Sequence, residues 1–143
     1  MSDMIIYPKS PREEIDGISC FVRTCDKIRL FAAGDLHQDY HANLGKGFDL
    51  WVCQILNINY PSLVTKVTAG GSDAEVLEWA YEQGEKPEEC RLEWWLSYIR
   101  NHGCRDERSE VLEKRKVEAG LGGREDILSY FDLIDVEEGR ELL

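Results

Sequence analysis

The sequence predicts a mainly α protein: a single compact domain of about six or seven helices, with a long glycine-containing loop after the second helix. Its 143 residues are the length of one domain, and a hydrophobic fraction of 43% supplies enough apolar surface for a core. Capping residues precede, and glycines follow, segments in which apolar side chains recur every three or four residues. We therefore expect residues 1–143 to form one domain, with a flexible N-terminus at residues 1–9.

The first two helices are expected before residue 34. Ser10 to Glu13 places a capping hydroxyl before a proline and a glutamate, the pattern of a helix start, and Gly17 is expected to end this short helix. In residues 18–33 apolar side chains recur at intervals of four, three and four, which indicates a second helix that Gly34 ends. The glycine-containing loop of residues 35–47 follows, and long loops in compact domains are often functional.

Two helices are expected in the middle of the chain. Phe48 to Leu56 is a dense apolar run, which we interpret as a buried helix, although a strand is the alternative that periodicity leaves open. Asn59 and Pro61 then form a cap and a start for a helix that extends to Ala69 and ends at two glycines.

The next two helices have clear starts. Ser72 to Glu75 is a capping box that opens a helix to Gln83. Pro87 begins another, which Gly103 ends, and its buried stripe is expected to consist of Leu92, Trp95, Leu96 and Ile99. Three tryptophans in these helices are expected to be core or core-edge residues: Trp79, Trp94 and Trp95.

The C-terminal part is predicted to hold an exposed helix and a last buried one. Residues 105–118 contain few apolar side chains, so their charges are most simply a solvated face. Gly120 to Gly123 is expected to be a turn, because it lacks the Lys-Ser/Thr ending of a phosphate-binding loop. The last sizeable helix is expected at Arg124 to Leu133, with one short turn more at Asp135 to Arg140.

Charge excludes two classes of partner. Seventeen Lys and Arg against 28 Asp and Glu give a net charge of −11, which repels nucleic acid and anionic membranes. Residues 1–60 carry a net charge of −2 and residues 61–143 carry −9, so an anion-binding site is expected in the first half. The five cysteines include no Cys-x-x-Cys pair, and no 18 apolar residues run together, so we expect reduced thiols in a cytoplasmic protein without a membrane span.

The predicted helix of residues 18–33 carries charges among apolar residues on every side. Asp26 and Arg29 are three residues apart and can neutralise each other, which would be a purely structural arrangement. Arg23, Lys27 and Arg29 together exceed the charge of one aspartate, so the alternative is that they hold an anionic ligand such as a carboxylate or a phosphate.

Tyr40 and His41 in the following loop are candidate proton donors and acceptors. With Asn43, Lys46 and Asp49 nearby in the sequence, they predict a polar pocket against the charged helix. A surface or capping role for the histidine is the alternative.

A metal site is the third hypothesis for this region. His37 and His41 have the spacing of two metal ligands on a helix, with His102 as a possible third. The neighbouring glycines argue against a regular helix there, so we predict no metal and no cofactor.

Several segments together resemble the bacterial domain-of-unknown-function family 5069. The most distinctive are the Asp-Lys-x-Arg segment at Asp26 to Arg29 and the Tyr-His-x-Asn-x-Gly-x-Gly-x-Asp segment at Tyr40 to Asp49. The resemblance covers residues 10–140 and implies a small bacterial protein, but it supplies no activity. His37 is not part of the family pattern, which weakens the metal hypothesis further.

The leading functional hypothesis is therefore a small soluble protein that binds, and in one version transforms, a small anionic metabolite. Lys27 and Arg29 would hold the anion, Asp26 would orient Arg29, and Tyr40 with His41 would handle protons. The alternative is an interaction or regulatory module without catalysis, whose acidic second half contacts a basic protein. The sequence leaves the oligomeric state open.

Overall fold

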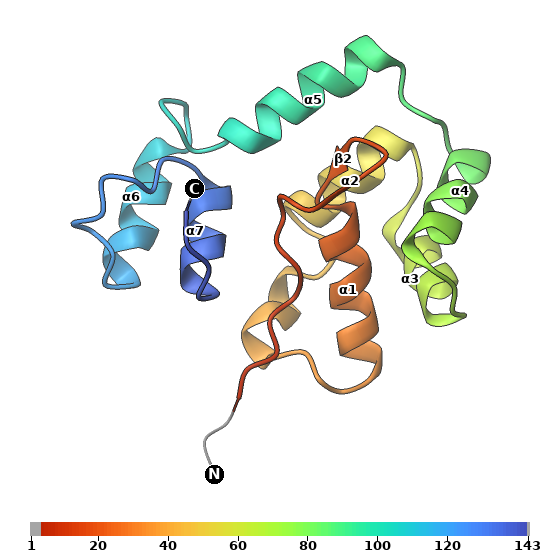
Figure 1. The fold of residues 1–143 in the computed structure, drawn as a ribbon, viewed down its shortest axis with the longest axis horizontal. Coiled ribbons are helices and arrows are strands. Elements are labelled where there is room, and N and C mark those ends of the chain that lie inside the picture. Colours follow the sequence, from red (N-terminus) through yellow and green to blue (C-terminus); the bar gives the residue numbers. More distant parts are fainter. Residues whose placement is uncertain (1–3, 143) are drawn as a thin grey trace. The chain divides into compact units, whose positions relative to one another are not determined.

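The mainly α class is confirmed by a computed structural model that describes residues 4–142. Within that range the chain forms seven α-helices, one 3-10 helix and a two-stranded hairpin (Figure 1). By contacts it divides into two compact units, residues 1–92 and 93–143. The single domain expected for residues 1–143 stays a prediction.

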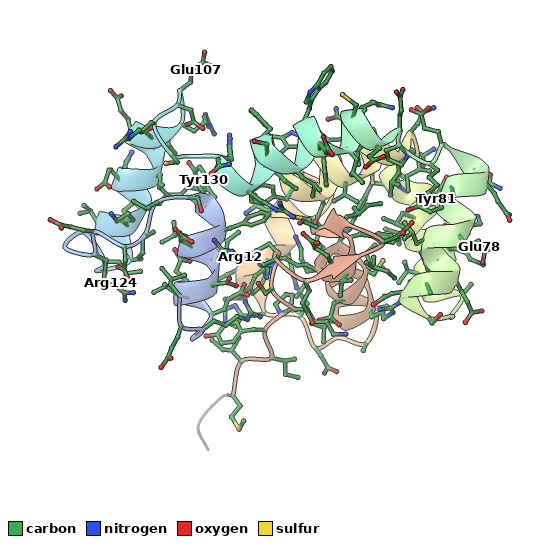
Figure 2. All side chains as sticks on the ribbon, turned by 45° about the horizontal axis from the view of Figure 1, so that its top comes forward. Arg12, Glu78, Tyr81, Glu107, Arg124 and Tyr130 are labelled. Carbon is green, nitrogen blue, oxygen red and sulfur yellow. The ribbon has the colours of Figure 1, made fainter. Side chains whose placement is uncertain are left out.

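A β-hairpin stands where the first helix was expected, so that prediction is wrong. Strands β1 (Glu14–Ile15) and β2 (Ile18–Ser19) pair antiparallel around Asp16 and Gly17. These two turn residues have positive φ angles of 49° and 77°, the backbone that a tight hairpin turn requires. Tyr81, labelled in Figure 2, donates a hydrogen bond of 2.6 Å to the Asp16 carboxylate and so ties the turn to helix α4 (Asp73–Gln83).

Helix α1 (Phe21–Ala32) is therefore the first helix of the chain, and the glycine-containing loop follows it. Its buried face includes Phe21, Cys25 and Ile28, three of the four residues whose spacing predicted a helix. The helix begins three residues later than expected, because residues 18 and 19 belong to β2. Ala33 is the C-cap, and Gly34 follows with a φ of +77°, as a helix stop requires.

The loop after α1 contains the short 3-10 helix η1 (Gln38–Asn43) and leads into α2 (Phe48–Leu56). The apolar run that periodicity left open is thus a helix. Asn59 caps α3 (Tyr60–Thr68) by accepting a hydrogen bond from the Ser62 N–H, as expected from the sequence. In the first unit α1 packs against α2, α3 and the hairpin.

Helix α4 (Asp73–Gln83) packs on α3 and opens with the predicted capping box, in which Ser72 and Glu75 each bond the backbone N–H of the other. Gly84 follows it, and the next backbone N–H, that of Glu85, donates to the Leu56 carbonyl at the end of α2. Helix α5 (Glu89–Asn101) begins two residues after Pro87, and its Ile99 is buried.

The second unit consists of the rest of α5 with α6 (Ser109–Glu118) and α7 (Tyr130–Glu137). The start predicted for the last helix, Arg124, is wrong. Residues 124–128 are turn and loop, and Ser129 caps α7 by accepting a hydrogen bond from the Asp132 N–H. The glycines of residues 120–123 lie in turn and loop, as expected.

His102 lies inside the second unit at the end of α5. Its ring stacks on Tyr130 at a centroid distance of 5.2 Å, and its backbone carbonyl accepts a hydrogen bond from the Tyr130 N–H. Burial lowers the pKa of His102 below its ordinary value of 6.5, and the nearby Asp106 carboxylate offsets only part of this effect. His102 is therefore held in its neutral form.

Stability is expected to fall as the pH is lowered below about 6.5, because the unfolded chain then takes up a proton on His102 that the folded chain does not accept. The measurement is the free energy of unfolding from urea titrations between pH 7 and pH 5. Replacement His102→Gln removes the imidazole and is expected to flatten the slope in that window, whatever it does to the absolute stability. If His102→Gln leaves the slope of the unfolding free energy against pH unchanged, this pH dependence does not come from His102.

Candidate functional site

Asp49, one of the polar residues that the sequence singled out in the first half, links three segments of the chain. It is 2% exposed and lies in the first turn of α2, where a negative charge is favoured by the helix dipole. Its carboxylate forms an ion pair with the Lys27 ammonium at 2.8 Å. It also accepts hydrogen bonds from the Thr24 hydroxyl at 2.9 Å and from the Gly45 backbone N–H at 3.2 Å. Asp49, Lys27, Thr24 and Gly45 form the Asp49 cluster, which joins α1, the loop and α2.

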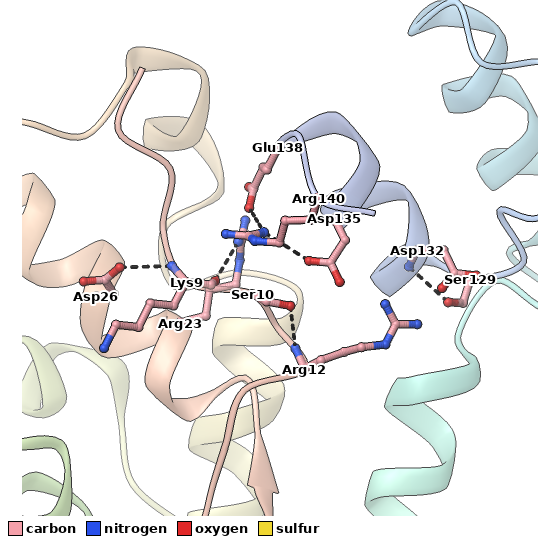
Figure 3. A network of polar contacts seen from close by, with 10 residues as sticks. All are labelled: Lys9, Ser10, Arg12, Arg23, Asp26, Ser129, Asp132, Asp135, Glu138 and Arg140. Atoms are coloured by element: carbon pink, nitrogen blue, oxygen red, sulfur yellow. Dashed lines mark hydrogen bonds and ion pairs between the residues drawn. The ribbon is translucent and has the colours of Figure 1, made fainter. Parts of the chain in front are cut away.

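The second predicted anion ligand, Arg29, is also held by a carboxylate. Its guanidinium bonds Asp73 at 2.7 Å, at the start of α4, and reaches the Gly71 carbonyl at 3.4 Å. The expected pair of Asp26 and Arg29 is wrong. Asp26 instead accepts a hydrogen bond of 3.0 Å from the Lys9 backbone N–H (Figure 3).

Lys9 is anchored on both sides, although residues 1–9 were expected to be flexible. Its carbonyl accepts a hydrogen bond of 3.0 Å from Arg23, and its N–H donates to Asp26 (Figure 3). Residues 1–3 lie outside the described part of the chain. The N-terminal segment is therefore fixed to α1 at Lys9 by two residues that were proposed as ligand-binding groups.

Tyr40 and His41 lie on η1 and take part in contacts that hold the loop. The Arg23 guanidinium is 5.8 Å from the centre of the Tyr40 ring, a cation–π distance. His41 Nε2 lies 2.9 Å from the Leu36 carbonyl oxygen, which can only accept a hydrogen bond, so Nε2 is the ring nitrogen that donates. The ring also packs edge-on against Phe31. The ring thus helps to hold the loop, and the proton-handling role of Tyr40 and His41 stays a prediction. Asn43 is exposed on the same turn.

Two cations of the predicted pocket, Lys27 and Arg29, are thus neutralised within the first unit. Lys27 faces Asp49 and Arg29 faces Asp73, so neither presents a free positive charge to a ligand. The thiols around them are equally inert: burial raises the pKa of Cys25 and of Cys53 to about 12, and that of Cys20 higher still. These thiols stay protonated at neutral pH and are poor nucleophiles.

The metal hypothesis gains no support from the geometry. His37 Nδ1 accepts the Asp39 N–H at 3.1 Å and so caps η1, while His102 belongs to the second unit. Within residues 4–142 there is no group of three or more His, Cys, Asp or Glu side chains that could hold a metal ion.

A different feature stands out on α5. Trp94 is 72% exposed and Tyr98, one helical turn later, is 57% exposed. The expectation that Trp94 is a core or core-edge residue is therefore wrong, whereas Trp79 and Trp95 are half-buried. Two large aromatic side chains on one exposed face are unusual for a surface without a binding role.

Sequence reasoning had a signal for this face and did not use it. At 100° per residue Trp94 lies about 160° from Leu92 and about 140° from Ile99, so the predicted buried stripe itself points Trp94 outward. Thr24, Gly45 and Asp73 were missed for another reason. Thr24 and Asp73 have partners 25 and 44 residues away, and Gly45 contributes a backbone N–H, so no helical spacing encodes these contacts.

Comparison with known proteins identifies a family. The sequence model described as "Domain of unknown function (DUF5069)" matches residues 5–140, which cover most of both compact units and every candidate residue above. No curated protein matches the chain. No helix within residues 4–142 is long and apolar enough to cross a membrane.

Proposed function

We propose that the chain, which belongs to the DUF5069 family, is an interaction module that binds a positively charged protein partner through the exposed face of α5. The observation that carries the proposal is the exposed pair Trp94 and Tyr98. Tryptophan and tyrosine are the residues most enriched in the energetic centres of protein interfaces, because they bury much apolar area at a small entropic cost. A cytoplasmic location is part of the proposal, and the five free thiols are compatible with it.

The charge of the surrounding chain supports a basic partner. Residues 73–93 contain only two basic residues, and each is engaged: Lys86 lies 3.8 Å from Asp16, and Arg91 bonds Glu85. The glutamates of this stretch remain exposed: Glu75, Glu78, Glu82, Glu85, Glu88, Glu89 and Glu93. A stretch of chain with this excess of negative charge attracts basic partners and speeds their association.

The small-anion hypothesis stays a prediction with less support. It needs Lys27 and Arg29 as ligand cations, and both have carboxylate partners. Binding of an anion would have to displace Asp49 or Asp73, and a displaced buried carboxylate is costly.

Recovery of the tagged protein from its own cytoplasm tests the proposal. We expect a stoichiometric protein partner with the parent chain, and its loss with Trp94→Ala, because truncation of an exposed interface tryptophan typically weakens binding by about 2 kcal/mol or more. Leu128→Ala is the matched control, since Leu128 is also exposed and apolar but lies outside α5.

Two results would contradict the module. One is a partner that both variants retain equally. The other is a small anion bound to the parent protein, detected by mass spectrometry, with no protein partner present.

A further inference from the structure

We infer that the second unit contains a pH-sensitive support for the docking face: protonation of His102 removes the packing that holds Tyr98, so mild acid weakens binding of the partner. The inference rests on the proposed function and adds a means of regulation to it. Every residue that it uses lies between Tyr98 and Tyr130, within the second unit.

The first step is a chain of three aromatic rings in contact. Tyr98 is 57% exposed on α5, and its ring centre lies 5.4 Å from that of His102, one helical turn later. The His102 ring also stacks on Tyr130 at the start of α7, and the backbones of these two residues share a hydrogen bond. His102 is thus the link between an exposed side chain of the docking face and the buried start of α7.

The second step is the charge around the imidazole. An Asp106 carboxylate oxygen lies 3.8 Å from His102 Nδ1, but this carboxylate is already engaged by two backbone N–H groups. The Arg108 cation opposes protonation, and the Arg115 guanidinium of α6 lies 5.9 Å from the centre of the Tyr130 ring. One shared carboxylate therefore faces two cations, and the burial of His102, which is 8% exposed, favours the neutral form.

The third step is the consequence of protonation. A charged imidazole is stabilised by water, and to reach water the His102 ring has to leave its contacts with Tyr98 and Tyr130. Tyr98 then loses the ring against which it packs and gains rotational freedom that docking has to remove again. Because the proton and the partner favour different states of the same side chains, each weakens the binding of the other.

Nuclear magnetic resonance of the isotope-labelled full chain tests the support between pH 7.5 and pH 5. The imidazole signals of the three histidines are assigned by replacing each with glutamine. We expect the His102 signals to titrate with a midpoint below 6.5. The three-bond couplings that report the χ1 angle of Tyr98 should move with the same midpoint towards the averaged values of a freely rotating side chain.

The partner recovered with the tagged chain is the second probe. Its dissociation constant is expected to rise about threefold or more between pH 7.5 and pH 5 for the parent chain. Two variants that cannot be protonated, His102→Gln and His102→Phe, should show little change, and the phenyl ring of the second can still pack against the tyrosines. His37→Gln, in the first unit, is the matched control and should behave as the parent does. Circular dichroism at both pH values checks that every variant is folded.

The outcomes separate this inference from the proposed function. If the Tyr98 couplings stay constant while His102 titrates, or if His102 stays neutral down to pH 5, the support is not pH-sensitive. If the partner binds the parent chain equally at both pH values, or weakens as much with the two His102 variants, His102 does not control docking. If no partner is recovered, the proposed function fails, and the resonance measurement still decides whether protonation of His102 releases Tyr98.

Discussion

Replacement Gly84→Ala is expected to lower the free energy of unfolding by about 3 kcal/mol or more, the upper range for a side chain forced into a filled space. A Cβ atom at this position would stand 2.0 Å from the Leu56 carbonyl oxygen and 2.6 Å from that of Asn57. Both obstacles are backbone atoms at the end of α2, so no side-chain rotation relieves the overlap. The Glu85 N–H, one residue later, satisfies the same Leu56 carbonyl, so a shift of the chain would also break that bond.

The measurement is urea unfolding followed by circular dichroism. Gly123→Ala is the matched control, because nothing lies within 4 Å of its Cβ position and its φ is not in the left-handed region. That control is expected to change stability by less than about 1 kcal/mol in either direction. Equal stability of the two variants would show that α4 does not approach the end of α2 as closely as described.

The second large effect is expected from Lys27→Met, with a loss of about 3 kcal/mol, the lower end of the cost of leaving one partner of a buried ion pair alone. The Asp49 carboxylate would keep its hydrogen bonds from Thr24 and Gly45 but lose the charge that neutralises it.

The structure predicts that Asp26→Asn costs less than about 1 kcal/mol, because the amide oxygen of Asn can still accept the Lys9 N–H. The two variants are therefore compared in the same thermal and urea unfolding series. A double variant, Lys27→Met with Asp49→Asn, removes both charges and is expected to recover at least half of the lost stability. If the double variant is no more stable than Lys27→Met alone, packing of the lysine stem, not its charge, is what matters.

Signals confined to one turn of helix explain what the sequence predicted correctly. The capping box at Ser72 and the cap at Asn59 lie within three residues of the groups that they bond, so the starts of α4 and α3 are readable. The same kind of signal was present and overlooked at Ser129, which bonds the N–H of Asp132 three residues later. The true start of α7 was thus available from the sequence.

The hairpin was missed because two local signals competed. Ser10 to Glu13 looks like a helix start, but in the structure it is a turn. The Glu13 N–H donates to the Ser10 carbonyl. The Arg12 N–H donates to the Ser10 hydroxyl (Figure 3). Asp16-Gly17 is a strong hairpin signal, and it decides the outcome because both residues adopt positive φ angles.

The sequence placed the candidate site in the first half of the chain, but it did not predict which charged side chains form ion pairs there. Asp26 was assigned to Arg29 because spacings of three and four are the ones that a helix makes visible. The partner that Arg29 does have is Asp73, separated from it by 44 residues, and Lys27 reaches Asp49 over a separation of 22. Such contacts depend on how whole helices pack, which a single sequence does not specify.

The Asp49 cluster closes the glycine-containing loop into a ring, because Lys27 lies before the loop and Asp49 after it. The conformational entropy lost on closing a flexible ring grows only slowly with its length, by about 0.6 kcal/mol for each doubling. Residues 35–44 lie inside the ring, and most of them are exposed. Insertions in this stretch that leave the contacts of Tyr40 and His41 intact are therefore expected to cost little, whereas a change at Lys27 or Asp49, which close the ring, needs a compensating change at the other.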